Sequence, residues 1–374
     1  MGEYVFNDVI KSKSGEYFLR TANSIYQHRV ISSFFRNGTL LDSQFVEHDQ
    51  QISEDLLLKT TRSFHEEKKS EVGSLLELSD QLKESQQAES KNLLGLAFMK
   101  KGMFDEAISE FEDAIVLEPE KSVVYNNLGK AYISVGRLEE AIDVLEKAII
   151  LSPNFADLHN NLGRAYLRKS QCRNAVASFK KSIAINTYYP DAFYNLGLAY
   201  VLNAHTREDF ELSVDCYSKV MSCMEKATRI NPNFNNEHFA EGEKYLKEEK
   251  FELALQAFQK GYDMVSGSGH IDMAFILDFY LKVIHSGNRM KSSVIWKHIR
   301  RLEGLLKKYP SYADLYNHLG VAYVIMSKFL NNKAVNLFNK AMEINPHFEK
   351  AKRNKRLAEY DHKGIQLLFD AILK

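Results

Sequence analysis

The sequence predicts a mostly α-helical protein, in which a right-handed solenoid of helical hairpins follows a small N-terminal α+β module. Three observations lead to this prediction. Small and apolar residues recur every 34 positions through the middle of the chain. The first 50 residues lack this recurrence and are rich in β-forming residues. Only six prolines occur among 374 residues, which suits long helices because proline removes a helical hydrogen bond.

Residues 1–50 are expected to form an antiparallel β-meander. Short runs of aromatic and β-branched residues alternate with turn-forming residues, as is typical of neighbouring strands. The dipeptide Asn37-Gly38 favours a tight hairpin, because both residues tolerate a positive φ. The predicted strands cover about residues 3–10, 16–22, 28–36 and 39–47.

A covering or bridging helix is expected over residues 51–87. Ser53 precedes its first turn, and apolar residues from Leu56 to Leu82 keep helical spacing. A sheet this small needs a partner to bury its apolar face, and this helix is the nearest candidate. We expect a break near Gly73, because glycine weakens a helix. This N-terminal module resembles no family.

The repeat begins with glycines 34 positions apart, each in the motif Leu-Gly followed three residues later by an aromatic residue. Small alanines and large apolar residues follow at the same period. Small residues let two helices cross closely, while large ones fill the gap to the next hairpin. The aligned positions are Gly95, Gly129, Gly163 and Gly197; Phe98, Tyr132, Tyr166 and Tyr200; Ala107, Ala141 and Ala175; and Phe111, Leu145 and Phe179.

This pattern resembles the tetratricopeptide repeat, whose period is 34 residues. Pro119 and Pro153 close the first two units as the family pattern requires, whereas the third unit has Ser182 and Thr187 in place of its second alanine and its proline. The resemblance implies an α-solenoid in which the first helices of successive units line a concave groove. Repeats one to five are assigned to residues 88–266.

The later units are less regular. The fourth carries an insertion of 11 residues near 203–218, and residues 267–312 read as a degenerate helical pair. A further helical hairpin is expected over 313–346, with a turn two residues longer than before, because Tyr323 and Ala334 are separated by 11 positions and not nine. Residues 347–374 are expected to form a C-terminal capping helix.

The resemblance also indicates which residues face a partner. Asparagines recur in two adjacent columns of the first helices, one turn before larger polar residues. Stacked amides offer donors and acceptors that suit an extended peptide backbone. An alternative is that these amides form hydrogen bonds within the solenoid. The candidate partner-binding residues are Asn92, Asn126, Asn127, Lys130, Asn160, Asn161, Arg164, Arg168, Tyr194 and Asn195.

Some members of the family bind a C-terminal carboxylate with a clamp of lysine and arginine. The matching positions here hold Val123, Asp157, Asp191 and Asn195, so this recognition is not expected. Charge is uneven along the chain, with an acidic stretch from Asp105 to Glu146 and basic clusters after Arg289. These charges are either solvated outer faces or contacts with an acidic partner or a second copy.

Composition excludes several function classes. Lysine plus arginine and aspartate plus glutamate number 49 each, so no net field attracts nucleic acid or membranes. The three cysteines and twelve histidines show no metal-ligand spacing, and no phosphate-binding loop occurs. We therefore expect a non-enzymatic cytoplasmic protein without cofactor or metal. No apolar run is long enough to span a membrane.

The favoured hypothesis is a scaffold or adaptor that binds a protein or an extended peptide in the groove. A second hypothesis is a self-assembling structural protein, a homo-oligomer that uses its charged ends or its C-terminal helix. A third is that the N-terminal module binds an unrecognised ligand.

Overall fold

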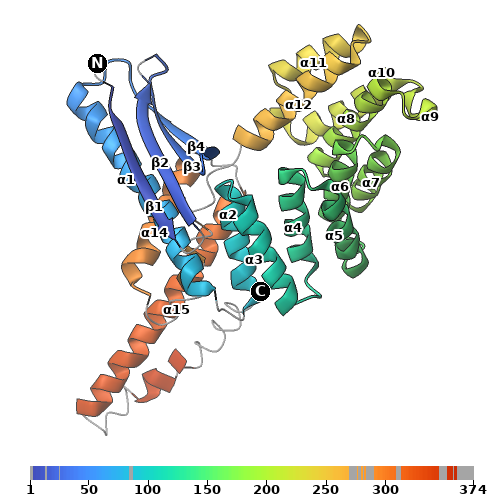
Figure 1. The fold of residues 1–374 in the computed structure, drawn as a ribbon. Helices are drawn as coiled ribbons and strands as arrows, with labels where there is room; N and C mark the ends of the chain where they lie inside the picture. Colours follow the sequence, from blue (N-terminus) through green and yellow to red (C-terminus); the bar gives the residue numbers. More distant parts are fainter. Residues whose placement is uncertain are drawn as a thin grey trace. The chain divides into compact units, whose positions relative to one another are not determined.

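The computed structural model describes residues 3–12, 15–24, 26–83, 87–268, 276, 279–280, 282–283, 290–308, 313–344, 352–356 and 358–359. Its contacts divide the chain into two units, Met1–Met273 and Ala274–Lys374. Figure 1 shows the ribbon of both.

The first unit starts with a four-stranded antiparallel sheet in the order β1-β2-β3-β4, which confirms the predicted meander. The register alternates inward and outward side chains, so Tyr17, Leu19, Val30 and Phe34 are buried on one face. The β3–β4 turn lies at Asn37-Gly38, both with positive φ, as the sequence predicts. The strands are β1 (Val5–Ser12), β2 (Gly15–Ser24), β3 (Arg29–Arg36) and β4 (Thr39–Glu47).

Helix α1 (Glu54–Leu82) packs against β1, β2 and β3 and so covers the sheet as expected. Ser53 caps it by accepting a hydrogen bond from the amide of Leu56. The predicted break near Gly73 is wrong, because the helix is continuous there. Buried neighbours on the same helix, Val72 and Leu75 among them, hold this turn in place and outweigh the low helix propensity of glycine.

Helical hairpins follow, each a first helix packed antiparallel on a second one (Figure 1). A side chain on the second helix fills the space left by the glycine of the first. A Cβ atom on Gly163 would lie 2.5 Å from Phe179, and one on Gly129 would lie 2.6 Å from Leu145. The hairpins are α2 (Ala88–Lys100) with α3 (Phe104–Leu117), α4 (Ser122–Val135) with α5 (Leu138–Leu151), α6 (Ala156–Arg168) with α7 (Cys172–Ile185), and α8 (Pro190–Thr206) with α10 (Cys216–Ile230).

The first hairpin is fixed to the sheet. The carboxylate of Glu106 on α3 accepts a hydrogen bond from the hydroxyl of Tyr17 at 2.5 Å and pairs with Arg36 at 2.5 Å. Gly102, in the α2–α3 turn, lies so close to Leu41 that any Cβ there would clash with the carbonyl oxygen of Leu41. The meander therefore shares an interface with the repeat array.

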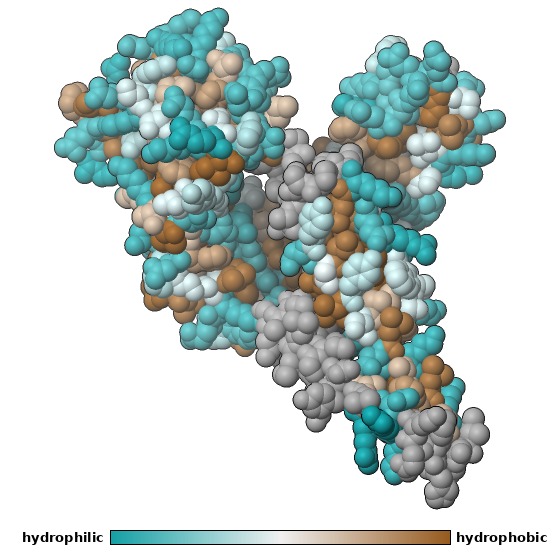
Figure 2. Space-filling view, turned by 180° about the vertical axis from the view of Figure 1, so that it is seen from behind, coloured by the Kyte–Doolittle hydropathy of each residue, from teal (hydrophilic) through white to brown (hydrophobic). Residues whose placement is uncertain are grey.

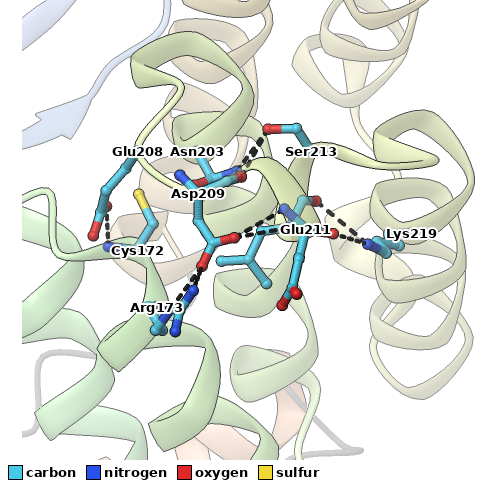
Figure 3. A network of polar contacts seen from close by, with 9 residues as sticks. Cys172, Arg173, Asn203, Glu208, Asp209, Glu211, Ser213 and Lys219 are labelled. Atoms are coloured by element: carbon cyan, nitrogen blue, oxygen red, sulfur yellow. Dashed lines mark hydrogen bonds and ion pairs between the residues drawn. The ribbon is translucent and has the colours of Figure 1, made fainter.

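The extra residues of the fourth hairpin lengthen the end of α8 and form the short helix α9 (Phe210–Ser213). Figure 3 shows the polar network that holds this insertion. Asp209 caps α9 through the amides of Glu211 and Leu212, and its other oxygen lies 2.7 Å from Nε of Arg173 on α7. The side chain of Asn203 exchanges hydrogen bonds with the backbone of Asp209. These hydrogen bonds hold the insertion against α7 and the end of α8.

The fifth hairpin, α11 (Glu237–Lys247) with α12 (Phe251–Ser268), has the same internal packing, with Gly242 against Phe258. Its attachment differs, because α12, not α11, packs extensively on the preceding array and lies along α8. The linker 231–236 is two residues longer than the linkers 118–121, 152–155 and 186–189. It contains the 3₁₀ helix η1 (Pro232–Phe234), which buries Phe234.

In the second unit, α14 (Ser292–Lys308) packs against α15 (Ala313–Ile344). The hairpin predicted for 313–346 is wrong, because α15 is one continuous helix. Eleven residues make about three helical turns, so Tyr323 and Ala334 share one face of a single helix. A spacing of nine would place them on opposite faces and require a turn. Residues 352–356 and 358–359 are helical, and the rest of the predicted cap lies outside the described residues.

Hydrophilic side chains predominate on the face of the molecule in Figure 2, with hydrophobic ones in separate patches. Within the part of the chain that the structure describes, no helix is both long enough and apolar enough to cross a membrane.

Candidate functional site

The candidate site is the surface formed by the first helices α2, α4, α6 and α8, which we call the first-helix wall. These helices lie next to one another, since α4 contacts both α2 and α6, and α6 contacts α8. Every candidate residue predicted from the sequence lies on these four helices. The 34-residue period places equivalent side chains at equal heights on neighbouring helices.

The six asparagines join the helices of the wall to one another. Asn127 donates to Asn92 at 2.9 Å, Asn161 donates to Asn126 at 2.9 Å, and Asn195 donates to Asn160 at 3.1 Å. Each bond connects one first helix to the next. We call this set of side-chain hydrogen bonds the amide ladder.

The amide ladder is buried. Its six side chains are between 2% and 5% exposed. Some have further partners, since Asn126 donates to Asp157, Asn160 donates to the hydroxyl of Tyr189, and Asn161 accepts from Arg164. A buried amide gains most from fixed partners of this kind. The hydrogen bonds match the alternative reading of the sequence, in which these amides connect the repeats internally.

Cationic side chains follow the ladder on the same wall. Lys130 on α4 and Arg164 on α6 are half-buried and occupy the same position of neighbouring repeats. Arg164 also donates to Asn161 at 3.3 Å, and Arg168 donates to the backbone carbonyl of Ile133 on α4. Burial lowers the pKa of Lys130, and the positive charges of Arg164 and Lys100 lower it further. The negative charge of Asp157 acts in the opposite direction. We call Lys100, Lys130, Arg164 and Arg168 the cation cluster.

The acidic and basic side chains of the wall differ in their partners. The three acids already have partners, since Glu89 pairs with Lys121, Asp157 accepts from Tyr189, and Asp191 accepts from Tyr262 at 2.9 Å. Within the described ranges, no member of the cation cluster forms an ion pair. The tyrosine hydroxyls leave Asp157 and Asp191 charged, so Asp157 offsets one of the four cations. The surface of α2, α4 and α6 keeps an excess of positive charge, whose natural complement is an anionic group.

One end of the wall is covered by the chain itself. The hydroxyl of Tyr194 donates to the carbonyl of Phe258 on α12, and its ring packs against Phe234 and Tyr262. Tyr194 is completely buried, and Asn195 is 2% exposed. The prediction that these two side chains are available to a partner is therefore wrong, because the long linker before α11 lets α12 pack on α8.

Apolar side chains remain exposed at the N-terminal ends of α4 and α6. Val123 and Phe155 are 49% and 40% exposed, and they line a shallow depression of about 450 Å³ together with Ser122, Ser152, Pro153 and Asn154. Val123 lies seven residues before Lys130, and hence on the same face of α4 two turns away. This depression and the cation cluster therefore belong to one continuous surface.

Sequence reasoning missed Lys100, Phe155 and Tyr262. A signal for Lys100 was present, because it occupies the same repeat position as Arg168, two periods earlier. Tyr262 carried no such signal, since its contact with Asp191 depends on how α12 attaches.

A chain of hydrogen-bonded polar side chains lies in the N-terminal module. His65 contacts Asp8 at 2.9 Å and Thr21 at 2.9 Å, and Thr21 donates to Ser32. Thr21 and His65 are 0% and 2% exposed, so no substrate reaches the hydroxyl. The chain connects α1 to the sheet. Among the described residues, no group of three or more histidines, cysteines or acids is arranged to hold a metal.

The fold and the wall define a class, the helical-repeat proteins built by stacking two-helix hairpins. The sequence model described as tetratricopeptide repeat matches residues 88–121 and 156–188, and one described as TPR repeat matches 129–170. The chain therefore contains tetratricopeptide repeats between residues 88 and 188. This family serves protein–protein interaction and is typically non-catalytic.

Solved structures of similar proteins include MamA, with 27% identity over 47% of this chain and 96% of that chain, at a TM-score of 0.35. TTC0263, a thermophilic TPR protein of Thermus thermophilus, has 16% identity over 52% of this chain and 98% of that chain, with a TM-score of 0.38. YrrB, described as a TPR protein with an unusual peptide-binding site, has 18% identity over 55% and 97%, with a TM-score of 0.35. No curated protein sequence matches the chain.

Proposed function

We propose that this protein is a non-catalytic adaptor that holds a protein or an extended peptide on the first-helix wall of α2, α4 and α6. The observation that supports the proposal is the cation cluster, whose four positive charges on α2, α4 and α6 exceed the single negative charge of Asp157 beside them. The apolar depression at Val123 and Phe155 adds a second kind of contact on the same surface. Cations and apolar pockets on a rigid frame are what peptide recognition needs.

Within this proposal, the candidate residues have two roles. Lys130, Arg164 and Arg168 contact the partner. The amides at 92, 126, 127, 160 and 161 fix the spacing of the helices that present these cations. A preorganised wall loses little conformational entropy when a partner binds. We further propose a reducing cytoplasmic location, which the three free, buried cysteines favour.

Site-specific crosslinking tests the location of the partner. A photo-reactive amino acid replaces Val123 on the wall, or Ile150 on the second helix α5 as the matched control. Both side chains are exposed, at 49% and 80%, so neither replacement disturbs the core. Illumination in native lysate is expected to attach a discrete protein partner through position 123 and not through position 150. Equal yields at both positions, or no product at 123, would refute the proposal.

A further inference from the structure

The chemistry of the partner follows from the cation cluster and its surroundings. Lys130 and Arg164 occupy the same repeat position on α4 and α6, which contact each other, and the charges of Arg164 and Lys100 help to lower the pKa of Lys130. Like charges brought together in a half-buried position destabilise the free protein, and this loss is relieved when an anion binds between them. The neighbouring Asp157 stays charged, because its donors Tyr189 and Asn126 are neutral, and it offsets only part of this positive charge.

The space available at the site limits the shape of the ligand. Helix α12 covers the wall at α8, where Tyr262 donates to Asp191, so the open surface extends over α2, α4 and α6. Along α4, Val123 and Lys130 are about 10 Å apart at 1.5 Å per residue. An extended chain covers that distance in about three residues. A ligand that reaches both points places an apolar and an acidic side chain about three positions apart.

We infer that the first-helix wall selects an extended peptide segment rich in aspartate or glutamate, whose carboxylates lie between Lys130 and Arg164 while an apolar side chain about three residues away fills the depression at Val123. This inference rests on the proposed function and names the partner's chemical class. A peptide is favoured over nucleic acid because the depression is apolar and fits an apolar side chain. Carboxylate pairing with guanidinium and ammonium groups supplies the directional part of the recognition.

The test is a selection from a random dodecapeptide library on the full-length protein. It is repeated on a double variant, Lys130→Gln with Arg164→Gln, and on a control variant, Lys180→Gln with Lys181→Gln. The control cations are exposed on the second helix α7, away from the wall, so both variants lose the same net charge. Circular dichroism melting confirms that each variant folds. Fluorescence anisotropy then measures the affinity of the best selected peptide at low and moderate salt.

The wild-type and control proteins are expected to select peptides with two or more acidic residues and an apolar residue about three positions away. Each substitution of a wall cation is expected to weaken the binding of the best peptide about tenfold, and its affinity for the wild-type protein should fall as salt rises. Selected peptides without acidic enrichment that still compete for position 123 would overturn the inference and leave the proposed function intact. Selection that yields no binders, or binders indifferent to the double variant, would overturn the inference, while the proposed function is decided by crosslinking at position 123.

A fluorescent single-stranded RNA of 20 uridines is the second probe, under the same salt conditions. We expect no saturable binding that depends on Lys130 and Arg164. If this RNA binds more tightly than the best selected peptide, and only the wall variant abolishes its binding, then the cation cluster serves nucleic acid, and the inference is wrong.

Discussion

The regular stack from α4 to α8 and the hairpin α11–α12 show the same internal packing but different attachment. In both, a glycine on the first helix accommodates an apolar side chain of the second, as with Gly163 and Phe179 or Gly242 and Phe258. In the stack, amides such as Asn161 bond across each joint, whereas α12 is held on α8 by aromatic rings and the Tyr262–Asp191 hydrogen bond. Contacts within each unit therefore determine the hairpin, while contacts between successive units determine how the hairpins stack.

The largest effect is expected inside the hairpins. Gly163→Ala and Gly242→Ala each place a methyl group within 2.7 Å of a phenylalanine ring and should lower the free energy of unfolding by about 2–3 kcal/mol. Gly197→Ala meets only the flexible end of Met224 at 2.8 Å and should lower it by about 1 kcal/mol or less.

Urea denaturation followed by circular dichroism measures these three variants. If Gly242→Ala proves much milder than Gly163→Ala, the two hairpins do not share their internal packing, and the first half of the comparison fails.

A smaller loss is expected at the joints of the regular stack. Asn161→Ala removes the donor to Asn126 and the acceptor for Arg164, so the buried oxygen of Asn126 loses its partner. We expect a loss of about 1–2 kcal/mol, with hydrogen exchange accelerated in α4 and α6 and unchanged in α11. Unchanged protection in α4 and α6 would show that the amide ladder does not stabilise this joint.

At the attachment of α12 the expected effect is smaller still. Tyr262→Phe keeps the ring against Phe234 and removes the hydroxyl that donates to Asp191. The attachment should weaken by about 1 kcal/mol, visible as faster hydrogen exchange in α12 while α4–α7 keep their protection. Equal acceleration in both regions would mean that α12 and the regular stack open as one cooperative unit.

The smallest effect concerns the thiols buried in α7 and α10. Burial, assisted by Glu208, raises the pKa of Cys172 to about 12, and burial raises that of Cys223 to about 11. A raised pKa favours the neutral thiol, so its stabilisation is complete below pH 9 and is lost as pH rises through 11–12. Neither thiol should react with a disulfide reagent at about pH 8 unless urea is added. Rapid reaction of the folded protein would contradict their burial.

Local patterns fixed much of this fold in advance. The meander, its Asn37-Gly38 turn and the hairpins up to residue 230 could be predicted, because period and turn chemistry act over short distances. The predictions that failed involved competition between local and distant terms. Packing of the buried neighbours outweighed the low helix propensity of Gly73. The 11-residue spacing after Tyr323 is compatible with one long helix as well as with a hairpin, and the structure contains the long helix.

The candidate site was predicted less completely. The recurring asparagines identified the first-helix wall, but in the structure these side chains form hydrogen bonds between neighbouring helices. Lys130 and Arg164 could be predicted as site residues from the sequence, but the hydrogen-bond partners of the acids around them could not. That pairing depends on hydrogen bonds from Tyr189 and Tyr262, and the position of Tyr262 follows from the attachment of α12 and not from the repeat.

By itself the sequence determined the repeat, its glycine positions and the face each helix presents, because these depend on residues close along the chain. Gly102 and Gly136 illustrate what it left open. They stand one period apart, and both adopt a positive φ at the end of a first helix. Only the tertiary structure distinguishes them, since Gly136 has open space around it whereas Gly102 lies against the backbone of Leu41. Contacts between distant segments decided how the sheet joins the array, where α12 closes the wall, and which charges remain open to a partner.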